Sequence, residues 1–274
     1  MSPSVITSRS NPLVARYRAA ARGDAGDLVL LDGAHLVGDA LGAGVAIQHL
    51  AATPAAQTRP EVSPLVAAAA RAGAEVSSVS ENVMDALSPV RSASGVVARA
   101  ARPVHTMTRV FASDSPFVVV AVDVQDPGNL GAIARVAEAG GATGLIAAGA
   151  SADPFGWKAL RGSMGSSLRL PLAVATADAA LAEARRHHCR IVASVPRDGR
   201  PLYDVDMTGP LAILIGGEGP GLIPIVADAA DERITIPMQA PVESLNTAVA
   251  AAVIVYEARR QRTGSATKTR SHEG

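Results

Sequence analysis

The chain has 274 residues, enough for about two domains with a substantial buried core, and its 25 Lys and Arg balance 25 Asp and Glu. The balanced charge gives no argument for or against an acidic partner, and the single cysteine, Cys189, excludes an intrachain disulfide and a cluster of zinc-binding thiolates. No uninterrupted apolar stretch reaches the ~20 residues that span a bilayer, so we expect a soluble, cytoplasmic protein.

The first hundred residues predict a small α/β domain, which we assign to residues 1–101. A helix-like segment follows Asn11-Pro12, and four arginines without an acid among them form a basic patch there: Arg9, Arg16, Arg18 and Arg22. The other expected elements are a strand at 28–33, a helix at 34–44, a strand at 46–53, a helix ending at Gly73, and the segments 74–80 and 95–100.

A second domain follows a polar linker that we assign to residues 102–114, because this stretch is bounded by proline and lacks periodicity. Strand and helix patterns alternate over residues 115–262, which predicts a parallel, doubly wound α/β domain. Strands are expected at 117–124, 144–149, 190–195, 211–216 and 233–238. Helices are expected at 130–139, around 157–160, and at 178–187, 222–230 and 245–261. The last residues, 263–274, are small, polar and basic, and we expect them to be disordered.

The stretch DPGNLGAIAR, residues 126–135, lies directly after the apolar run FVVVAV, which is typical of a strand buried on both faces of a sheet. Ligands bind in open α/β sheets at the carboxyl ends of such strands. Asn129 and Arg135 are therefore candidate site residues. Taken singly, Asn129 is more typical of a helix N-cap than of a site residue, and Arg135 is more typical of a solvated position that pairs with Glu138.

A second loop, in LAILIGGEGPGL at residues 211–222, again follows an apolar strand and is rich in glycine, which lets a backbone approach a ligand closely. The loop lacks the Lys-Ser/Thr of a phosphate-binding Walker motif and the glycine spacing of a dinucleotide fingerprint. The acid in this loop, Glu218, is either a solvated turn residue or a functional group.

A third candidate stretch, ITIPMQAPVESLNTAVA, covers residues 234–250, and a helix pattern begins after Pro241. Ser244 lies where a helix N-cap is expected, and Asn246 is unusual for a first helical turn because asparagine is a poor helix former. All three stretches begin at the ends of strands of one predicted sheet. The candidate polar residues are therefore expected to meet there: Asn129, Arg135, Glu218, Ser244 and Asn246.

Two further clusters give weaker signals. His187, His188 and Cys189 resemble a metal-binding tract, but adjacent helical positions point in different directions, so we expect no metal site. Trp157 is more typical of a core residue than of a stacking surface, although Lys158, Arg161 and Arg169 near it are able to contact phosphates.

The three stretches, in this order and at these distances, resemble the three motifs of the SpoU/TrmH family of RNA ribose 2′-O-methyltransferases within the SPOUT superfamily. The resemblance covers Ser115 to about Arg262. More loosely, SRSNPLVARYR followed by LVLLDGAHLV is similar to the ribosomal-protein-like substrate-binding domain that many members carry. This sequence has Ala240 where the family commonly has glycine, Thr247-Ala248 in place of Val-Ser, and Asp32 where the first domain often has glutamate.

The resemblance implies a C-terminal parallel-sheet domain with a deep trefoil knot, a homodimer, and S-adenosylmethionine bound in the knot. It implies that the cofactor is held by Gly216, Ile236 and Leu245. It also implies catalytic-site roles for Asn129, Arg135, Glu218, Ser244 and Asn246, without a metal. Binding of RNA is expected at Arg9, Arg16, Arg18, Arg22 and Arg161.

The implied reaction is methyl transfer to a ribose 2′-hydroxyl of RNA, with 23S ribosomal RNA as the favoured substrate and transfer RNA as the alternative. Arg135 acts either as the base or as a group that orients the ribose and its phosphate, because guanidinium groups hardly deprotonate in proteins. Two rivals stay open: a knotted RNA-binding or ribosome-assembly protein without activity, and, less favoured, a nucleotide-dependent oxidoreductase.

Overall fold

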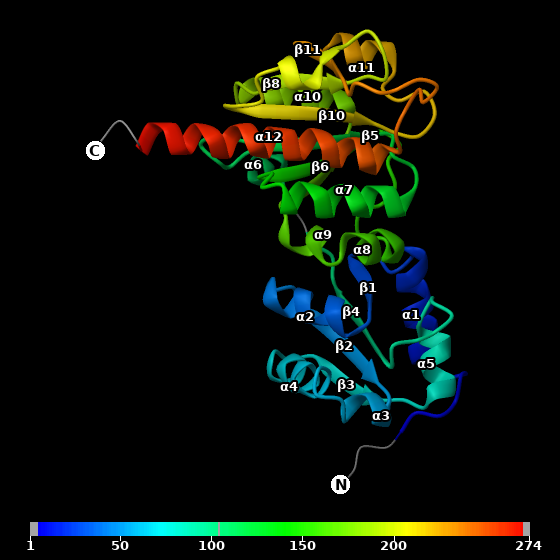
Figure 1. Ribbon diagram of the computed structural model, residues 1–274. Coiled ribbons are helices and arrows are strands. Elements are labelled where there is room, and N and C mark those ends of the chain that lie inside the picture. Colours follow the sequence, from blue (N-terminus) through cyan, green and yellow to red (C-terminus); the bar gives the residue numbers. More distant parts are fainter. Residues whose placement is uncertain (1–4, 104, 271–274) are drawn as a thin grey trace. The chain divides into compact units, whose positions relative to one another are not determined.

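The computed structural model describes residues 5–103 and 105–270, the last seven of them by their backbone alone (Figure 1). Contacts divide the chain into two units. Unit 1 contains the residues up to Pro103 together with Phe155–Arg169, and unit 2 contains the rest. No helix in the described part of the chain is long and apolar enough to cross a membrane.

Unit 1 is built around a mixed sheet in which β4 runs antiparallel to both β1 and β2, while β2 and β3 are parallel. Its strands are β1 (Leu28–Asp32), β2 (Ile47–Ala52), β3 (Glu75–Ser78) and β4 (Val96–Ala101). Its helices are α1 (Pro12–Arg22), α2 (Ala34–Gly42), α3 (Pro54–Gln57), α4 (Ser63–Arg71), α5 (Glu81–Leu87), α8 (Trp157–Ser163) and α9 (Ser166–Arg169). Helices α1 and α5 cover one face of the sheet, and α2 and α4 cover the other (Figure 1).

Helix α1 illustrates how the sequence determines an element in unit 1. The Asn11 side chain accepts a hydrogen bond from the backbone N–H of Leu13, Pro12 occupies the first turn, and Gly23 ends the helix with a φ of 81°. The buried side of the helix carries Tyr17, which is fully buried against the sheet.

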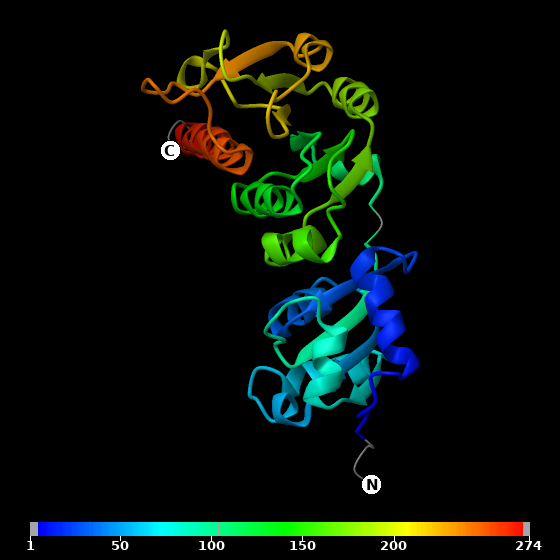
Figure 2. The ribbon, with the colours of Figure 1, turned by 90° about the vertical axis from the view of Figure 1, so that its right-hand side faces the viewer.

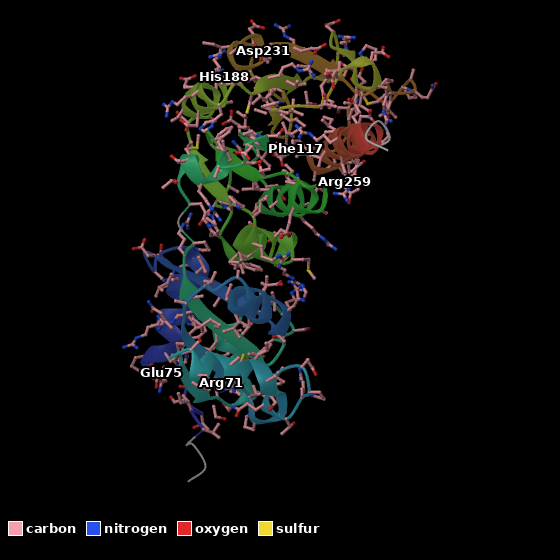
Figure 3. All side chains as sticks on the ribbon, turned by 90° about the vertical axis from the view of Figure 1, so that its left-hand side faces the viewer. Arg71, Glu75, Phe117, His188, Asp231 and Arg259 are labelled. Carbon is pink, nitrogen blue, oxygen red and sulfur yellow. The ribbon has the colours of Figure 1, made fainter. Side chains whose placement is uncertain are left out.

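Tyr17 belongs to a buried polar cluster with His49 and Ser77. The Tyr17 hydroxyl lies 2.8 Å from Nδ1 of His49, and Ser77 Oγ lies 3.0 Å from Nε2. Burial lowers the pKa of His49 below 6.5. The charge of exposed Glu75 opposes this shift, and the charge of Arg99 adds to it (Figure 3).

We expect the stability of unit 1 to fall as the pH drops below about 6.5, the pKa of an unfolded histidine. Between that value and the lower pKa of folded His49, the unfolded chain binds more protons than the folded chain. The free energy of unfolding therefore decreases as the pH is lowered through this range. Hydrogen-exchange protection of the β2 amides, measured at about pH 7.5 and about pH 5.5, tests this. His49→Gln should reduce the pH dependence, whereas His105→Gln in unit 2 should not. Equal protection at both pH values would contradict the expectation.

Unit 2 contains, within residues 105–270, a sheet of seven parallel strands in the order β7-β6-β5-β10-β8-β11-β9. They are β5 (Phe117–Val122), β6 (Gly144–Ala148), β7 (Leu172–Ala175), β8 (Arg190–Ser194), β9 (Arg200–Pro201), β10 (Leu211–Gly216) and β11 (Glu232–Thr235). Its helices are α6 (Met107–Val110), α7 (Pro127–Ala139), α10 (Ala177–Arg186), α11 (Pro224–Asp228), α12 (Thr247–Arg270) and the short 3₁₀ helix η1 (Leu202–Asp204). The mixed α/β class with a parallel sheet is confirmed.

Helices cover both faces of this sheet, which explains why β5, β6 and most of β10 are buried along their whole length. Helices α6, α10 and α11 pack on one face. Helices α7 and α12 lie side by side on the other, as Figures 1 and 2 show. The two helices approach so closely that a Cβ added at Gly140 would overlap the side chain of Val255.

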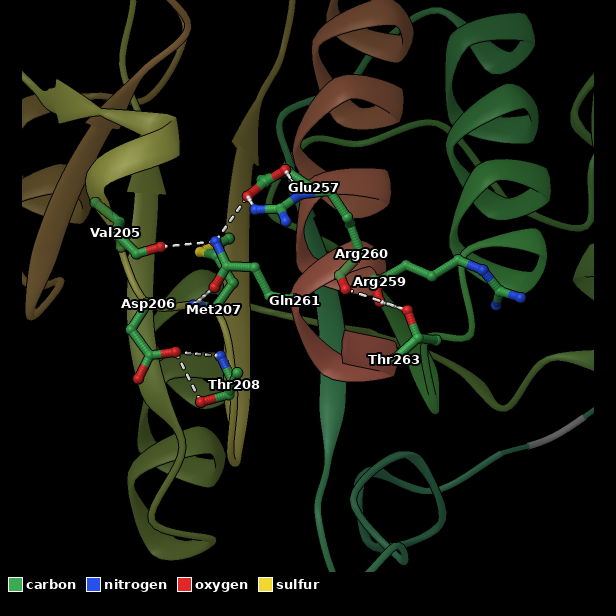
Figure 4. A network of polar contacts seen from close by, with 9 residues as sticks. All are labelled: Val205, Asp206, Met207, Thr208, Glu257, Arg259, Arg260, Gln261 and Thr263. Atoms are coloured by element: carbon green, nitrogen blue, oxygen red, sulfur yellow. Dashed lines mark hydrogen bonds and ion pairs between the residues drawn. The ribbon is translucent and has the colours of Figure 1, made fainter. Parts of the chain in front are cut away.

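A polar network fastens the second half of α12 to the segment after η1 (Figure 4). The Gln261 side chain accepts a hydrogen bond from the backbone N–H of Met207 (2.8 Å) and donates one to the Val205 carbonyl (3.0 Å). Gln261 also donates to Glu257 (2.8 Å), which is buried and paired with Arg260 (2.7 Å). Hydrogen bonds from Arg260 lower the pKa of Glu257 and keep it ionised. These contacts fix the position of the helix that begins at the candidate site.

Four helices differ from the sequence expectations. Helix α6 lies within the expected linker 102–114. Helices α8 and α9 group with unit 1, because Trp157 packs against its core and Arg169 pairs with Asp39 (2.6 Å). Helix α12 continues to Arg270, into the tail that we expected to be disordered, because a packed helix propagates through residues that would not nucleate one. Residues 271–274 lie outside the described chain.

Candidate functional site

A cavity of about 330 Å³ lies at the carboxyl ends of β8, β10 and β11 in unit 2. This size falls at the lower end of the ~300–1,000 Å³ of small-molecule sites. The second and third sequence stretches supply most of its wall, and the end of β8 supplies the remainder. The lining residues are Ser194, Val195, Pro196, Ile215, Gly216, Gly217, Glu218, Gly219, Gly221, Ile236, Met238, Ser244, Leu245, Asn246, Thr247 and Ala250.

Close backbone approaches explain the glycines of the second loop. A Cβ at Gly216 would overlap the backbone of Gly221 and Leu222, and a Cβ at Gly217 would overlap the carbonyl of Asp123. Asp123 itself has a φ of 55°, and its side chain accepts a hydrogen bond from the N–H of Ala150 (2.7 Å). The loop after β10 is therefore pressed against the loop after β5, and only glycine fits at these contacts.

A chain of hydrogen bonds connects all three stretches beside the cavity. Asn246 Nδ2 donates to Asn129 Oδ1 (3.1 Å), and Asn129 Nδ2 donates to Glu218 Oε1 (2.6 Å). The other carboxylate oxygen of Glu218 accepts from the backbone N–H of Gln125 (3.1 Å). Because Asn246 Oδ1 accepts the N–H of Ala248 (2.9 Å), its Nδ2 must donate toward Asn129, so each amide has one possible orientation.

Glu218 is held as a carboxylate by this arrangement. Burial alone would raise its pKa, but the hydrogen bonds from the Asn129 side chain and from nearby backbone N–H groups outweigh that effect and lower it. An ionised Glu218 accepts two hydrogen bonds that a protonated carboxyl would partly lose. Glu218 is therefore a structural anchor for the loops and not a proton donor at neutral pH.

The structure assigns the helix caps differently from the sequence analysis. Asp126, not Asn129, caps α7, since its side chain accepts the N–H of Asn129 (2.8 Å). Asn246, not Ser244, caps α12, because its Oδ1 accepts the N–H groups of Ala248 and Val249 (2.9 and 3.3 Å). The cap expected at Ser244 was wrong because α12 begins two residues later than the apolar spacing suggested. The poor helix propensity of Asn246 was the correct signal.

The structure brings most of the predicted site residues together. Gly216, Ile236 and Leu245 line the cavity, as do Glu218, Ser244 and Asn246, and Asn129 joins through its hydrogen bonds. Arg135 does not line the cavity. It is exposed on α7, two turns from the helix start, and has no hydrogen-bond or ion-pair partner among the described residues.

Sequence reasoning missed two contributions to the site. Ser194, Val195 and Pro196 form one wall, and the available signal was that RIVASV ends at the same edge of the parallel sheet. Thr247 donates its hydroxyl hydrogen to the Gly216 carbonyl (2.7 Å) and so fastens α12 to the second loop. The departure of this sequence from Val-Ser therefore adds a contact at the cavity and does not disrupt it.

The predicted RNA-contacting arginines all lie in unit 1, in varied surroundings. Arg9 and Arg18 donate through Nε to backbone carbonyls of Asn82 and Ala86 on α5 (2.9 and 3.3 Å). Arg22 pairs with Asp24 (2.7 Å). The remaining two are exposed without a hydrogen bond among the described residues: Arg16 on α1 and Arg161 on α8.

Other candidate chemistry is weak. His187 stacks on Phe111 (ring centroids 5.1 Å apart) and pairs with Glu183 (3.3 Å), and burial raises the pKa of Cys189 to about 11, so its thiol is protonated. Within residues 5–103 and 105–270, no group of three or more His, Cys, Asp or Glu side chains is arranged to hold a metal ion.

Fold and cavity together define the class of protein. A doubly wound parallel sheet encloses a small-molecule cavity at the carboxyl ends of its strands, with glycine-rich backbone on one side and ordered amide, hydroxyl and carboxylate groups on another. This combination is that of an α/β enzyme that binds a cofactor.

Comparisons with known proteins identify the family. Residues 116–256 match the SpoU rRNA Methylase family, and residues 20–98 match the MRM3-like substrate binding domain. An uncharacterized tRNA/rRNA methyltransferase of Synechocystis sp. is 35% identical over 271 residues, 96% of each chain. The 23S rRNA (guanosine-2'-O-)-methyltransferase RlmB of Shewanella oneidensis is 33% identical over 210 residues, 73% of this chain and 84% of that one. The chain belongs to the SpoU rRNA Methylase family.

A solved structure shows the same fold over nearly the whole length. The crystal structure of an AdoMet-bound rRNA methyltransferase from Sinorhizobium meliloti matches with a TM-score of 0.85 at 30% identity, covering 94% of this chain and 97% of that one. The resemblance inferred from the three sequence stretches is confirmed.

Proposed function

We propose that this chain transfers a methyl group from S-adenosylmethionine to a ribose 2′-hydroxyl of ribosomal RNA, with the large-subunit RNA as substrate. The observation that carries the proposal is the chain Asn246–Asn129–Glu218 beside a glycine-walled cavity. The name of the relative RlmB, a 23S rRNA (guanosine-2'-O-)-methyltransferase, and the AdoMet bound in the similar structure support it.

The cavity fits the proposed cofactor. Apolar side chains of Val195, Ile236 and Leu245 suit an adenine ring, and Gly216 and Gly217 bring main chain into the cavity wall. S-adenosylmethionine, when bound, supplies a methyl group already activated by its sulfonium. The protein therefore needs to position the ribose hydroxyl in line and remove one proton.

The polar residues divide into two roles in this proposal. Asn246 and Glu218 hold the loops, and Asn129 and Ser244 position the ribose or Arg135. Arg135 orients the ribose and its phosphate through its planar guanidinium, or accepts the proton. Arg135 is exposed and has no hydrogen-bond or ion-pair partner in the part of the chain that the structure describes, which leaves it available to RNA.

The division of charge between the units supports RNA as the partner. Unit 1 contains 12 Lys and Arg against 8 Asp and Glu, whereas unit 2 contains 13 against 17. The neutral total therefore conceals a basic unit, to which Arg9, Arg16, Arg18, Arg22 and Arg161 all belong. A basic unit attracts the phosphate backbone.

We expect replacement of Arg16 and Arg161 by glutamine to weaken RNA binding and flatten its salt dependence. Each lost phosphate contact should reduce the slope of log K against log salt by roughly 0.7–0.9, so the double variant should lose roughly 1.5. Filter binding over a salt series measures this, with Arg71→Gln as a control that removes the same kind of charge from unit 1. An unchanged slope would place the RNA elsewhere.

The reaction itself is tested by incubating the protein with labelled S-adenosylmethionine and total RNA from a strain that lacks this gene. Label on a ribose 2′-oxygen of large ribosomal RNA is the expected result, and label in transfer RNA would instead support the alternative substrate. Cofactor binding without label in any RNA would favour a binding or assembly protein.

Three further features belong to the proposal. A homodimer is supported by apolar side chains on the exposed side of α12, where Val249 and Tyr256 are each half exposed. The proposal also includes a trefoil knot in residues 115–262 and a cytoplasmic location, and membership of the family supports both.

A further inference from the structure

An exposed ion pair lies beside the candidate cavity. Arg197 Nη2 lies 2.6 Å from Glu243 Oε1. Each residue is the chain neighbour of a residue that lines the cavity, Pro196 in one case and Ser244 in the other. Arg197 and Glu243 also line a second hollow of about 470 Å³, which shares Pro196, Ile236 and Met238 with the first. The pair therefore connects the segment after β8 with the segment before α12, both of which line the cavity.

The two ends of this ion pair differ in how firmly they are held. On the Arg197 side, the N–H of Val195 donates to the Ile234 carbonyl (2.9 Å), and the N–H of Gly199 donates to Thr235 Oγ1 (3.0 Å). A Cβ at Gly199 would come within 2.6 Å of the Ile234 backbone, so this segment is pressed directly onto β11.

The Glu243 side is held by much less. Residues 239–246 are all exposed and form no regular element. Among the described residues, the backbone hydrogen bonds of this segment before Asn246 reduce to one, from the N–H of Val242 to the Gln239 carbonyl. Ser244 has no hydrogen bond of its own there. Within residues 5–103 and 105–270, the ion pair is thus the one polar contact of the segment between β11 and the cap at Asn246 with another segment.

We propose that Arg197 and Glu243 are positioning residues that hold segment 239–246 over the cavity and so set the places of Ser244 and Leu245 against the cofactor. The inference rests on the proposed function. An exposed pair contributes little to global stability, but here its effect acts on a loop with few other restraints. It should therefore be seen in cofactor affinity.

Charge reversal tests the proposal by direct titration of S-adenosylmethionine in the absence of RNA. Arg197→Glu and Glu243→Arg should each raise the Kd for the cofactor about threefold to fivefold, and the double variant should restore it to within about twofold. Raising the salt from about 0.05 M to about 0.5 M should weaken binding to the unaltered chain and leave Arg197→Ala unaffected.

Arg200→Glu is the matched control. Arg200 lies three residues after Arg197, pairs with Glu232 (3.0 Å) and lines neither hollow. An equal loss of affinity in Arg200→Glu and Arg197→Glu would overturn the proposal, as would failure of the double variant to restore binding. No cofactor binding by the unaltered chain would contradict the proposed function, whereas equal binding by all variants would contradict only the role of the pair.

Discussion

Asn129→Asp is expected to lower methyl transfer by about 100-fold at neutral pH, the loss that a misplacement of about 1 Å can cause. Asn129 Nδ2 donates to Glu218 Oε1 at 2.6 Å, and aspartate would place a second carboxylate at that contact. Glu218 is already held in its ionised form, so the two carboxylates repel unless they share a proton. The loop that carries Asn129 and the loop that carries Glu218 would move apart.

The pH dependence separates this cause from a general loss of folding. When two carboxylates compete, the pKa of one is raised, so protonation at lower pH restores a hydrogen bond between them. The relative activity of Asn129→Asp should therefore rise as the pH is lowered, while cofactor binding persists. Gln125→Glu adds the same charge to the same loop without occupying the Asn246–Asn129–Glu218 chain, and should retain activity. If the activity lost in Asn129→Asp were the same at every pH, this explanation would be contradicted.

The location of the site was predictable from the sequence because parallel strands share one carboxyl edge. Three polar or glycine-rich stretches that follow apolar strands are brought together at this edge. Two of them line the cavity, and the first stretch is joined to the second by the hydrogen bond from Asn129 to Glu218. The hydrogen-bond chain was not predictable, since nothing in the spacing of Asn129 and Glu218 indicates which amide atom faces which oxygen. The cap at Asn246 illustrates the same limit, because side-chain competition for backbone N–H groups decides it.

The grouping of α8 and α9 with unit 1 shows why the domain boundaries were harder to predict from the sequence than the location of the site. The periodic pattern of residues 115–262 continues through this segment, but packing of Trp157 on the core of unit 1 depends on contacts far apart in sequence. For the same reason the neutral composition concealed the unequal charges of the two units. Sequence pattern and composition indicate local secondary structure, whereas the division of the chain into two units depends on tertiary contacts.

Arg135→Ala is expected to reduce methyl transfer by about 10²–10⁴-fold, the range for loss of an acid-base or comparable positioning group, while the Kd for S-adenosylmethionine stays unchanged. Arg135 lies outside the cavity wall and is exposed, without a polar partner among residues 5–103 and 105–270, so its removal should cost little stability. Arg259→Ala removes an exposed arginine from the neighbouring helix α12 and is the control (Figure 3). Full turnover by Arg135→Ala with cofactor bound would remove Arg135 from the site.

Arg135→Lys distinguishes the two roles that we give to this residue. A lysine keeps the charge but loses the planar pair of donors, so an orienting role predicts a raised KM for RNA and a pH profile like that of the unaltered chain. If the residue accepts the proton, a lysine in its place would lose its proton at lower pH, because the ordinary pKa of lysine is lower than that of arginine. The rise in kcat with pH would then begin at a lower pH in Arg135→Lys. Single-turnover rates over a pH series decide between them, because they report chemistry without product release.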